Sequence, residues 1–84
     1  MTNLTSMRNI GKEMARKLAA VGIRSPEELL AAGSKEAFFR LKTVFPQVCL
    51  VHLYALEGAI QGVEFNILAA AKRRELKRFS DQLK

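Results

Sequence analysis

With 49% hydrophobic residues, a chain of 84 residues holds enough apolar side chains for one packed core and too many for a disordered segment. A single cysteine and a single histidine exclude an intrachain disulfide and any multi-thiolate or two-histidine metal site. The net charge of +6 favours an anionic partner, namely nucleic acid, an acidic protein or an anionic membrane surface.

No apolar run approaches membrane-spanning length, because His52 and Glu57 interrupt the best candidate. The first positive charge, Arg8, is not followed by the apolar stretch of a signal peptide. We therefore expect a soluble, cytoplasmic protein whose residues 1–84 form a single domain, without membrane contact, cofactor or small-molecule substrate.

The first predicted elements are a short helical segment over residues 3–7 and a helix over residues 12–21. The turn Asn9-Ile10-Gly11 joins them, and Gly22 stops the second helix. The core-facing residues of that helix recur at helical spacing: Met14, Leu18 and Val21.

The clearest helix start is the capping box Ser25-Pro26-Glu27-Glu28. Ser25 is the expected N-cap, Pro26 occupies the first helical position, and Glu28 reaches back toward the start. This helix is predicted to end at Gly33 in a left-handed cap. Its inward-facing residues are expected to be Leu29 and Leu30.

The middle of the chain is predicted to form two further helices. Ser34 is expected to cap the first, and Pro46 ends it. The inward residues of that helix are Phe38, Leu41 and Phe45. The second, over about residues 47–61, is apolar on nearly every side, so we expect it at the centre of the domain. Gly58 lowers its helix propensity by about 1 kcal/mol relative to alanine, which the close approach of another backbone would explain.

The last helix is predicted over about residues 67–83, after a short link at residues 63–66 in which Phe65 covers the core. Its inward residues are Leu76, Phe79 and Leu83, and its outward residues are Arg74, Lys77 and Arg78. Together these elements predict an all-α fold, a compact bundle of about five helices. Its N-terminal unit, residues 3–24, is helix-hairpin-helix-like (SAM-like).

The hairpin carries the candidate functional residues. A glycine in its turn permits positive φ and lets another backbone approach without a Cβ in the way. The start of the following helix presents unpaired N–H groups and a partial positive charge, which suit an anion. The candidate nucleic-acid-binding residues are Arg8, Asn9, Ile10, Gly11, Lys12 and Arg16.

Two interpretations of the hairpin stay open. Asn9 stands where such turns usually have a glycine; it tolerates a left-handed conformation, but its side chain lies where DNA would approach. The same hairpin is equally consistent with a packing unit in a protein-binding domain. Lys12 and Arg16 then belong to a solvated face, on which Glu13 and Lys17 are spaced for an i,i+4 ion pair.

Catalysis is the least supported class of function. Cys49 and His52 lie three apart on an apolar helix, but a thiol–imidazole nucleophile needs a third group and an open cleft. We interpret Cys49 as a buried small hydrophobe and predict no catalytic residue. Glu57 is expected to be partly buried and paired with an arginine from another segment.

The basic run Lys72-Arg73-Arg74, followed by Lys77 and Arg78, is typical of the solvated face of a terminal helix. Membrane-surface helices expose a broad apolar face, whereas the apolar stripe here is narrow. If the run lies on the hairpin's side of the molecule, it extends a positive surface begun there.

Three pieces of sequence occur in order: Arg8-Asn9-Ile10-Gly11, Val21-Gly22-Ile23 and Leu53-Tyr54-Ala55-Leu56-Glu57-Gly58-Ala59-Ile60. With shorter matches between them, they resemble the C-terminal domain of the TfoX (Sxy) competence regulators over almost all of the chain. Phe65 stands where that family more often has tryptophan. The resemblance implies bacterial regulation of natural transformation, by helping to switch on genes for DNA uptake. Larger family members carry a further N-terminal domain that these residues do not include.

The leading hypothesis is a non-catalytic regulatory domain that contacts the phosphate backbone of DNA, or a protein of a DNA-bound transcription complex. No strong base-reading element is evident, so any contact with DNA is expected to be mainly to phosphates. The alternative is a protein-interaction or self-association module without direct DNA contact. Its candidate surfaces are the small-residue side of the helix at residues 47–61 and the amphipathic last helix.

Overall fold

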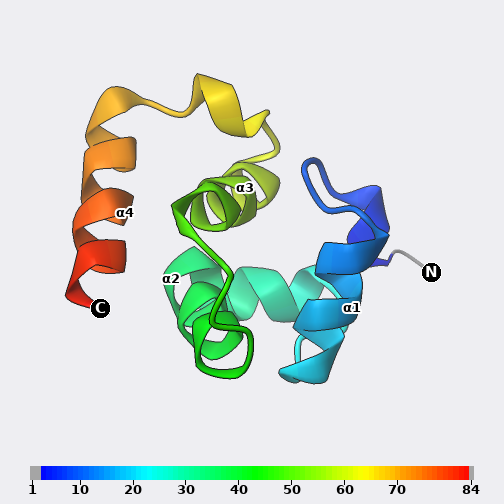
Figure 1. Ribbon diagram of the computed structural model, residues 1–84. Coiled ribbons are helices and arrows are strands. Elements are labelled where there is room, and N and C mark those ends of the chain that lie inside the picture. The colour runs from blue at the N-terminus through cyan, green and yellow to red at the C-terminus, as the bar shows by residue number, and fades with distance from the viewer. Residues whose placement is uncertain (1–2, 84) are drawn as a thin grey trace.

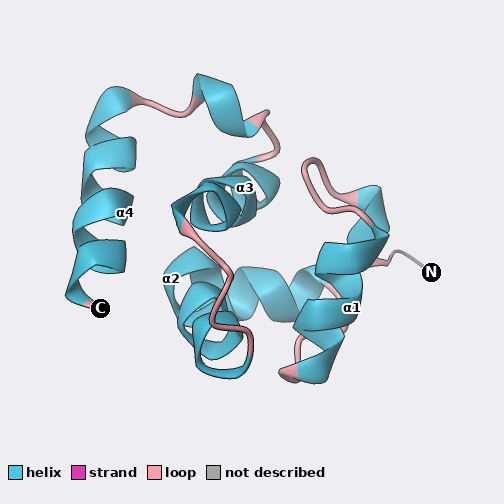
Figure 2. Ribbon diagram, in the orientation of Figure 1, coloured by secondary structure: helices cyan, strands magenta, loops and turns pink. Residues whose placement is uncertain are grey.

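Helices and 3-10 turns make up the regular structure of residues 3–83, the part of the chain that the computed structural model describes. In chain order the elements are η1 (Leu4–Ser6), α1 (Lys12–Ala20), α2 (Pro26–Val44), α3 (Leu50–Gln61), η2 (Phe65–Ile67) and α4 (Ala70–Gln82) (Figure 1). No strand occurs among these residues (Figure 2). The all-α prediction is therefore confirmed, with four α-helices and two 3-10 turns in place of about five helices.

Helix α3 lies between the other elements and contacts α2, α4 and η2 (Figure 1). This central place follows from its composition, since it is apolar on nearly every side and bears no charge in its first turn. It begins at Leu50 rather than at the predicted residue 47. The preceding linker is held instead by Lys42, whose ammonium donates to the carbonyls of Pro46 (2.9 Å) and Val48 (2.7 Å).

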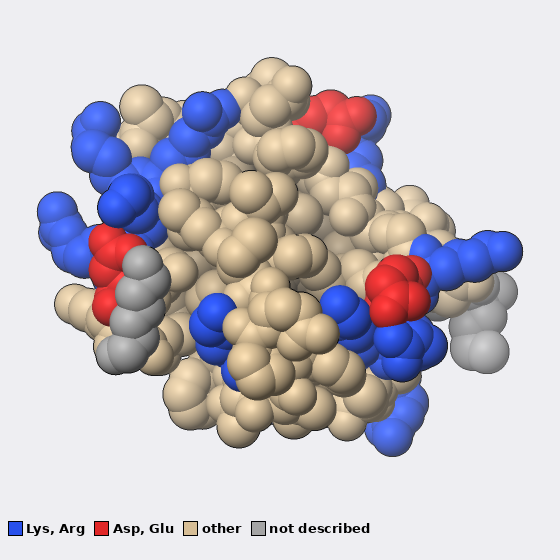
Figure 3. Space-filling model, in the orientation of Figure 1, with Lys and Arg blue, Asp and Glu red and all other residues tan. Residues whose placement is uncertain are grey.

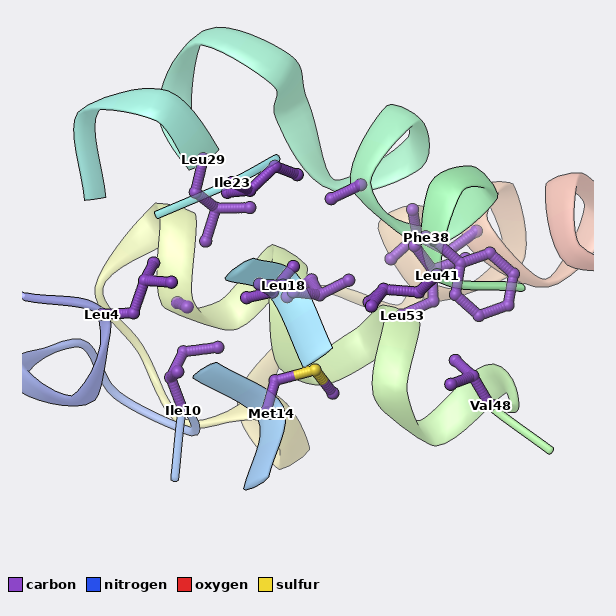
Figure 4. Packing of buried hydrophobic residues seen from close by; sticks show 14 of the residues in the cluster. Leu4, Ile10, Met14, Leu18, Ile23, Leu29, Phe38, Leu41, Val48 and Leu53 are labelled. Atoms are coloured by element: carbon purple, nitrogen blue, oxygen red, sulfur yellow. The ribbon is translucent and has the colours of Figure 1, made fainter. Parts of the chain in front are cut away.

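One hydrophobic core draws side chains from all four α-helices and from the loops between them. Figure 4 shows residues of the N-terminal segment converging on side chains from α2 and α3. The largest fully buried side chains are Phe38, Leu18, Ile23, Leu29, Leu41, Leu53, Leu56, Leu76 and Val48. Each leucine buried in this way stabilises the fold by about 1.5–3 kcal/mol relative to an exposed one.

The start of α2 has the predicted N-cap, and Glu28 reaches back as expected but to the residue before the N-cap. The Ser25 hydroxyl accepts from the backbone N–H of Glu28 (3.1 Å), and Pro26 occupies the first helical position. The Glu28 carboxylate reaches back and accepts from the backbone N–H of Arg24 (2.6 Å). Two donors at the helix start are thus satisfied by side chains, which fixes where α2 begins.

The predicted break at Gly33 is a kink within α2. Gly33 has φ 84° and ψ 162°, a conformation outside the helical region that glycine adopts without steric cost. The two helices expected on either side of it are therefore parts of one bent element. Ser34 faces inward at the bend, and its hydroxyl donates to the carboxylate of Glu57 (2.6 Å).

Leu30 and Phe65, both expected inside, lie at the surface. Leu30 is 53% exposed because its neighbour Leu29 takes the core-facing position, and consecutive helical residues point about 100° apart. Phe65 is 40% exposed because residues 65–67 form η2 rather than an extended link folded over the core. With η2 in that position, α4 begins at Ala70, three residues later than predicted.

The predicted close approach of another backbone to Gly58 is present. The approaching segments belong to the same chain. A Cβ built on Gly58 would lie 2.5 Å from the side-chain nitrogen of Asn9 and 2.7 Å from the carbonyl oxygen of Val63. Both distances are far shorter than a normal carbon contact. Gly58 therefore lets the hairpin turn and the chain after α3 pack directly on the helix backbone.

Replacing Gly58 by alanine is expected to destabilise the protein by about 1–3 kcal/mol, because the methyl group meets a backbone oxygen that cannot turn away. At an unhindered helix position the same change would stabilise by about 1 kcal/mol. Urea denaturation measures the difference. A gain in stability for Gly58→Ala would contradict the packing described here.

Candidate nucleic-acid interface

The left-handed residue of the hairpin turn is Asn9, with φ 68°. Gly11 instead has an ordinary extended backbone (φ −90°, ψ −177°) and serves as the N-cap of α1. The expectation that the turn glycine supplies the positive φ is therefore wrong. Asparagine fills this role because its short polar side chain makes the left-handed region less costly than for most residues.

The side chain of Asn9 points into the protein rather than toward an approaching DNA. Its amide donates to the carbonyl oxygens of Val63 (3.0 Å) and, at longer range, Ala55 (3.5 Å). One acceptor lies within α3 and the other just beyond its end. Asn9 thus fastens the hairpin turn to α3, and the predicted position of its side chain is corrected.

Ile10 is also a structural residue. Its side chain is 5% exposed and belongs to the core cluster, where Figure 4 shows it near Leu4 and Met14. The two central residues of the turn therefore hold the hairpin in place. Any contact with a ligand falls to the residues on either side of them.

Those flanking charges are largely paired. Arg16 pairs with Glu13 on the same helix, and Arg8 lies 3.7 Å from Glu64. The expected partner of Glu13, Lys17, instead places its ammonium 5.5 Å from the centroid of the Phe45 ring. The guanidinium of Arg16 holds the pKa of the Glu13 carboxyl below its ordinary value.

The start of α1 offers backbone N–H groups together with a carboxylate. Gly11 has no side chain to cap them, and Lys12 makes no ion pair among the described residues. Glu13, however, lies in the first turn, where its charge complements the helix dipole and opposes an incoming phosphate. A concavity of about 260 Å³ separates this turn from α3, and it is lined by Asn9, Gly11, Glu13, Met14, Lys17, Val51, His52 and Ala55.

The polar side chains considered for catalysis, those of Cys49, His52 and Glu57, have structural hydrogen bonds in and between helices. The backbone N–H of Cys49 donates to Nδ1 of His52 (3.0 Å), so the pair caps the start of α3, and Cys49 is exposed rather than buried. Glu57 accepts from Ser34 and from Gln61 (2.6 Å each), in place of the expected arginine.

The described residues contain no group of three or more His, Cys, Asp or Glu side chains placed to hold a metal ion. Within the same part of the chain, no helix combines the length and the apolar character needed to cross a membrane.

The basic run of α4 lies on the other side of the molecule from the hairpin. Figure 1 places α1 and α4 at opposite ends of the view, with α2 and α3 between them. Figure 3 accordingly shows separate groups of Lys and Arg side chains over the two ends. On the face shown, the two basic segments are therefore separate, with α2 and α3 between them.

A small all-α fold with a central apolar helix is thus defined, and the three-residue 3-10 turn η1 stands where the first helix of a helix-hairpin-helix unit was predicted. The chain matches the TfoX C-terminal domain family over residues 1–80. The chain belongs to this family. It is 32% identical over 80 residues to Protein Sxy of Escherichia coli (strain K12), covering 95% of this chain and 38% of that protein. The chain thus spans well under half the length of this curated relative.

Two crystal structures of proteins from Listeria monocytogenes share the fold. An uncharacterized protein in a triclinic form has 46% identity and a TM-score of 0.95, covering 98% of this chain and 93% of that one. A protein of unknown function in a tetragonal form has 47% identity and a TM-score of 0.87, covering 90% and 93%.

Replacing Asn9 by aspartate is expected to destabilise the protein by about 2–3 kcal/mol, because a carboxylate would face two carbonyl oxygens. The variant keeps a residue that tolerates positive φ, so the donor is what it tests. Asn9→Gly, which removes the amide and keeps a residue that adopts positive φ readily, should lose about 1 kcal/mol. Chemical denaturation compares the stability of the three proteins. Equal stability of Asn9→Asp and the wild type would show that the Asn9 amide does not stabilise the contact between the turn and α3.

The pH dependence of Asn9→Asp gives a second check. The carbonyl oxygens raise the pKa of the introduced carboxyl in the folded state above its unfolded value of about 3.9. The destabilisation is then full above the folded-state pKa, fades as the pH falls from that value toward the unfolded one, and is gone below it, because the protonated acid can donate.

Proposed function

We propose that this chain is a non-catalytic regulatory domain of the competence-regulator type, acting in the cytoplasm and contacting DNA phosphates without reading base sequence. Membership of the TfoX C-terminal domain family is the observation that carries the proposal. The net charge of +6 supports an anionic partner. The match covers 38% of Protein Sxy. A role in switching on genes for DNA uptake, which the resemblance to the competence regulators implies, is therefore part of the proposal.

The hairpin as a helix-hairpin-helix device is one proposed route to such contact. Lys12 and the first amides of α1 are the groups left to meet a phosphate, since Arg16 is held by Glu13. Asn9 and Ile10 would act only by keeping the turn in place.

Docking on a protein of a DNA-bound transcription complex, or self-association, is the second candidate function. The observation in its favour is a set of large hydrophobic side chains exposed on α2, α3 and η2: Leu30, Phe39, Val44, Val51, Phe65 and Ile67. The small-residue side of α3 is a weaker candidate than the sequence suggests. Gly58 and Ala59 are buried, with Gly58 against the protein's own chain.

Titration of fluorescent duplex DNA against salt tests the first function. The logarithm of the affinity should fall linearly with the logarithm of salt concentration, with a slope of about −0.9 per phosphate neutralised. Two duplexes of equal length and unrelated sequence should give the same affinity. Absence of binding even at low salt would exclude direct contact with DNA and leave docking on a protein as the surviving candidate.

A further inference from the structure

One face of α4 holds the helix to the rest of the protein. Leu76 is fully buried, and the hydroxyl of Tyr54 donates to the backbone carbonyl of Arg73 (3.4 Å). Lys35 of α2 pairs with Glu75 (2.6 Å) and lies 5.8 Å from the centroid of the Phe79 ring. The contacts of this inner face therefore set the position of α4. The residues of its outer face do not contribute to those contacts.

Both carboxylates of α4 form ion pairs with lysines. Glu75 accepts from Lys72 (3.3 Å) as well as from Lys35, and Asp81 accepts from Lys77 (3.1 Å). The hydrogen bonds from Lys35 and Lys72 lower the pKa of the Glu75 carboxyl below its ordinary value. The helix's own acidic residues are thus neutralised by lysines rather than by arginines.

Two arginines of α4 remain unpaired among the residues that the structure describes. Arg73 donates to the backbone carbonyl of Asn66, whereas the guanidinium groups of Arg74 and Arg78 make no ion pair or hydrogen bond among the described residues. Both are exposed. Four positions apart on one helix, they lie on the same side with their Cα atoms about 6 Å apart along the axis.

Arg74 and Arg78 line two surface concavities on α4, of about 300 and 410 Å³. Lys35 and its partner Glu75 also line the first, and Lys77 and its partner Asp81 the second. Figure 3 shows Lys and Arg side chains gathered over this end of the molecule. The outer face of α4 thus presents two free guanidinium groups in a row, and the carboxylates beside them are paired with lysines.

This chemistry fits a row of phosphates better than an anionic membrane. A guanidinium binds a phosphate through two parallel hydrogen bonds, and a nucleic-acid strand repeats its charge at a regular spacing. A membrane surface would require large apolar side chains beside the charges. The large exposed hydrophobic side chains of the described residues instead lie on α2, α3 and η2.

We propose that the outer face of α4, through Arg74 and Arg78, is the main surface by which this domain contacts the phosphate backbone of duplex DNA. This inference rests on the proposed function and names the surface that performs it. The hairpin is then chiefly a structural unit, with its turn turned inward and two of its three candidate cations paired.

Two double variants of the full chain, each removing two positive charges, test the assignment against the duplex used above. Arg74→Gln/Arg78→Gln should weaken binding roughly a hundredfold at 0.05 M salt and make the salt slope shallower by about 1.8, as two lost phosphate contacts require. The hairpin variant, Lys12→Gln/Arg16→Gln, tests the other proposed route and should make the slope shallower by less than the α4 variant does, because α4 is the main surface and Arg16 is already paired with Glu13. Arg74→Lys/Arg78→Lys should keep the slope of the wild type while binding more weakly, because charge is retained and the paired hydrogen bonds are lost.

Thermal unfolding of each variant shows whether a loss of DNA binding comes from the lost contact or from loss of the folded structure. Exposed and unpaired arginines are expected to change stability by no more than about 0.5 kcal/mol. If the wild type binds and the hairpin variant alone loses affinity, the assignment to α4 is wrong while the proposed function stands. If the wild type does not bind duplex DNA at all, the proposed DNA contact itself fails.

Competition separates phosphate recognition from a general attraction to negative charge. A short unlabelled duplex should displace the labelled DNA, whereas polyglutamate of equal charge should displace it poorly, because its flexible chain does not hold carboxylates at the regular close spacing of duplex phosphates. Equal competition by polyglutamate, or by vesicles of phosphatidylglycerol, would overturn the assignment to nucleic-acid phosphates.

Discussion

The contact between Asn9 and the end of α3 fixes where the N-terminal hairpin sits. Its amide reaches the carbonyl oxygens of Ala55 and Val63, and Gly58 provides the room for that approach. The contact is possible only because the backbone of Asn9 is left-handed and the helix lacks a Cβ at residue 58. With the turn held there, Ile10 enters the core and α1 packs against α2.

Patterns within a few residues of one another were sufficient to predict much of the fold. The start of α2 follows from Ser25 and Glu28, whose hydrogen bonds are local. The central place of α3 follows from its apolar composition. Gly33 was correctly marked as an irregular position, but the sequence does not distinguish a helix end from a kink, because both demand a backbone that glycine adopts readily.

The candidate site was less predictable because its decisive contacts join distant segments. Asn9 lies 46 and 54 residues from its two acceptors, and nothing near it in sequence indicates that its side chain turns inward. The one signal available was Gly58, whose cost within a helix predicted a close neighbour without naming it. Similarly, the pairing of Glu75 with Lys35 of α2, and hence the freedom of Arg74 and Arg78, depends on how two helices pack.

A glycine at the left-handed position of a hairpin turn leaves the backbone open to a ligand, whereas an asparagine there adds an amide that requires partners when it is partly buried. In this protein the amide finds those partners in its own chain, so the turn gains stability and gives up an open surface. A residue that satisfies an intramolecular contact so fully has little left to offer a phosphate. The positive charges best placed for an anionic partner are then those whose position is fixed by other residues, as Leu76 and Glu75 fix α4 while Arg74 and Arg78 stay free.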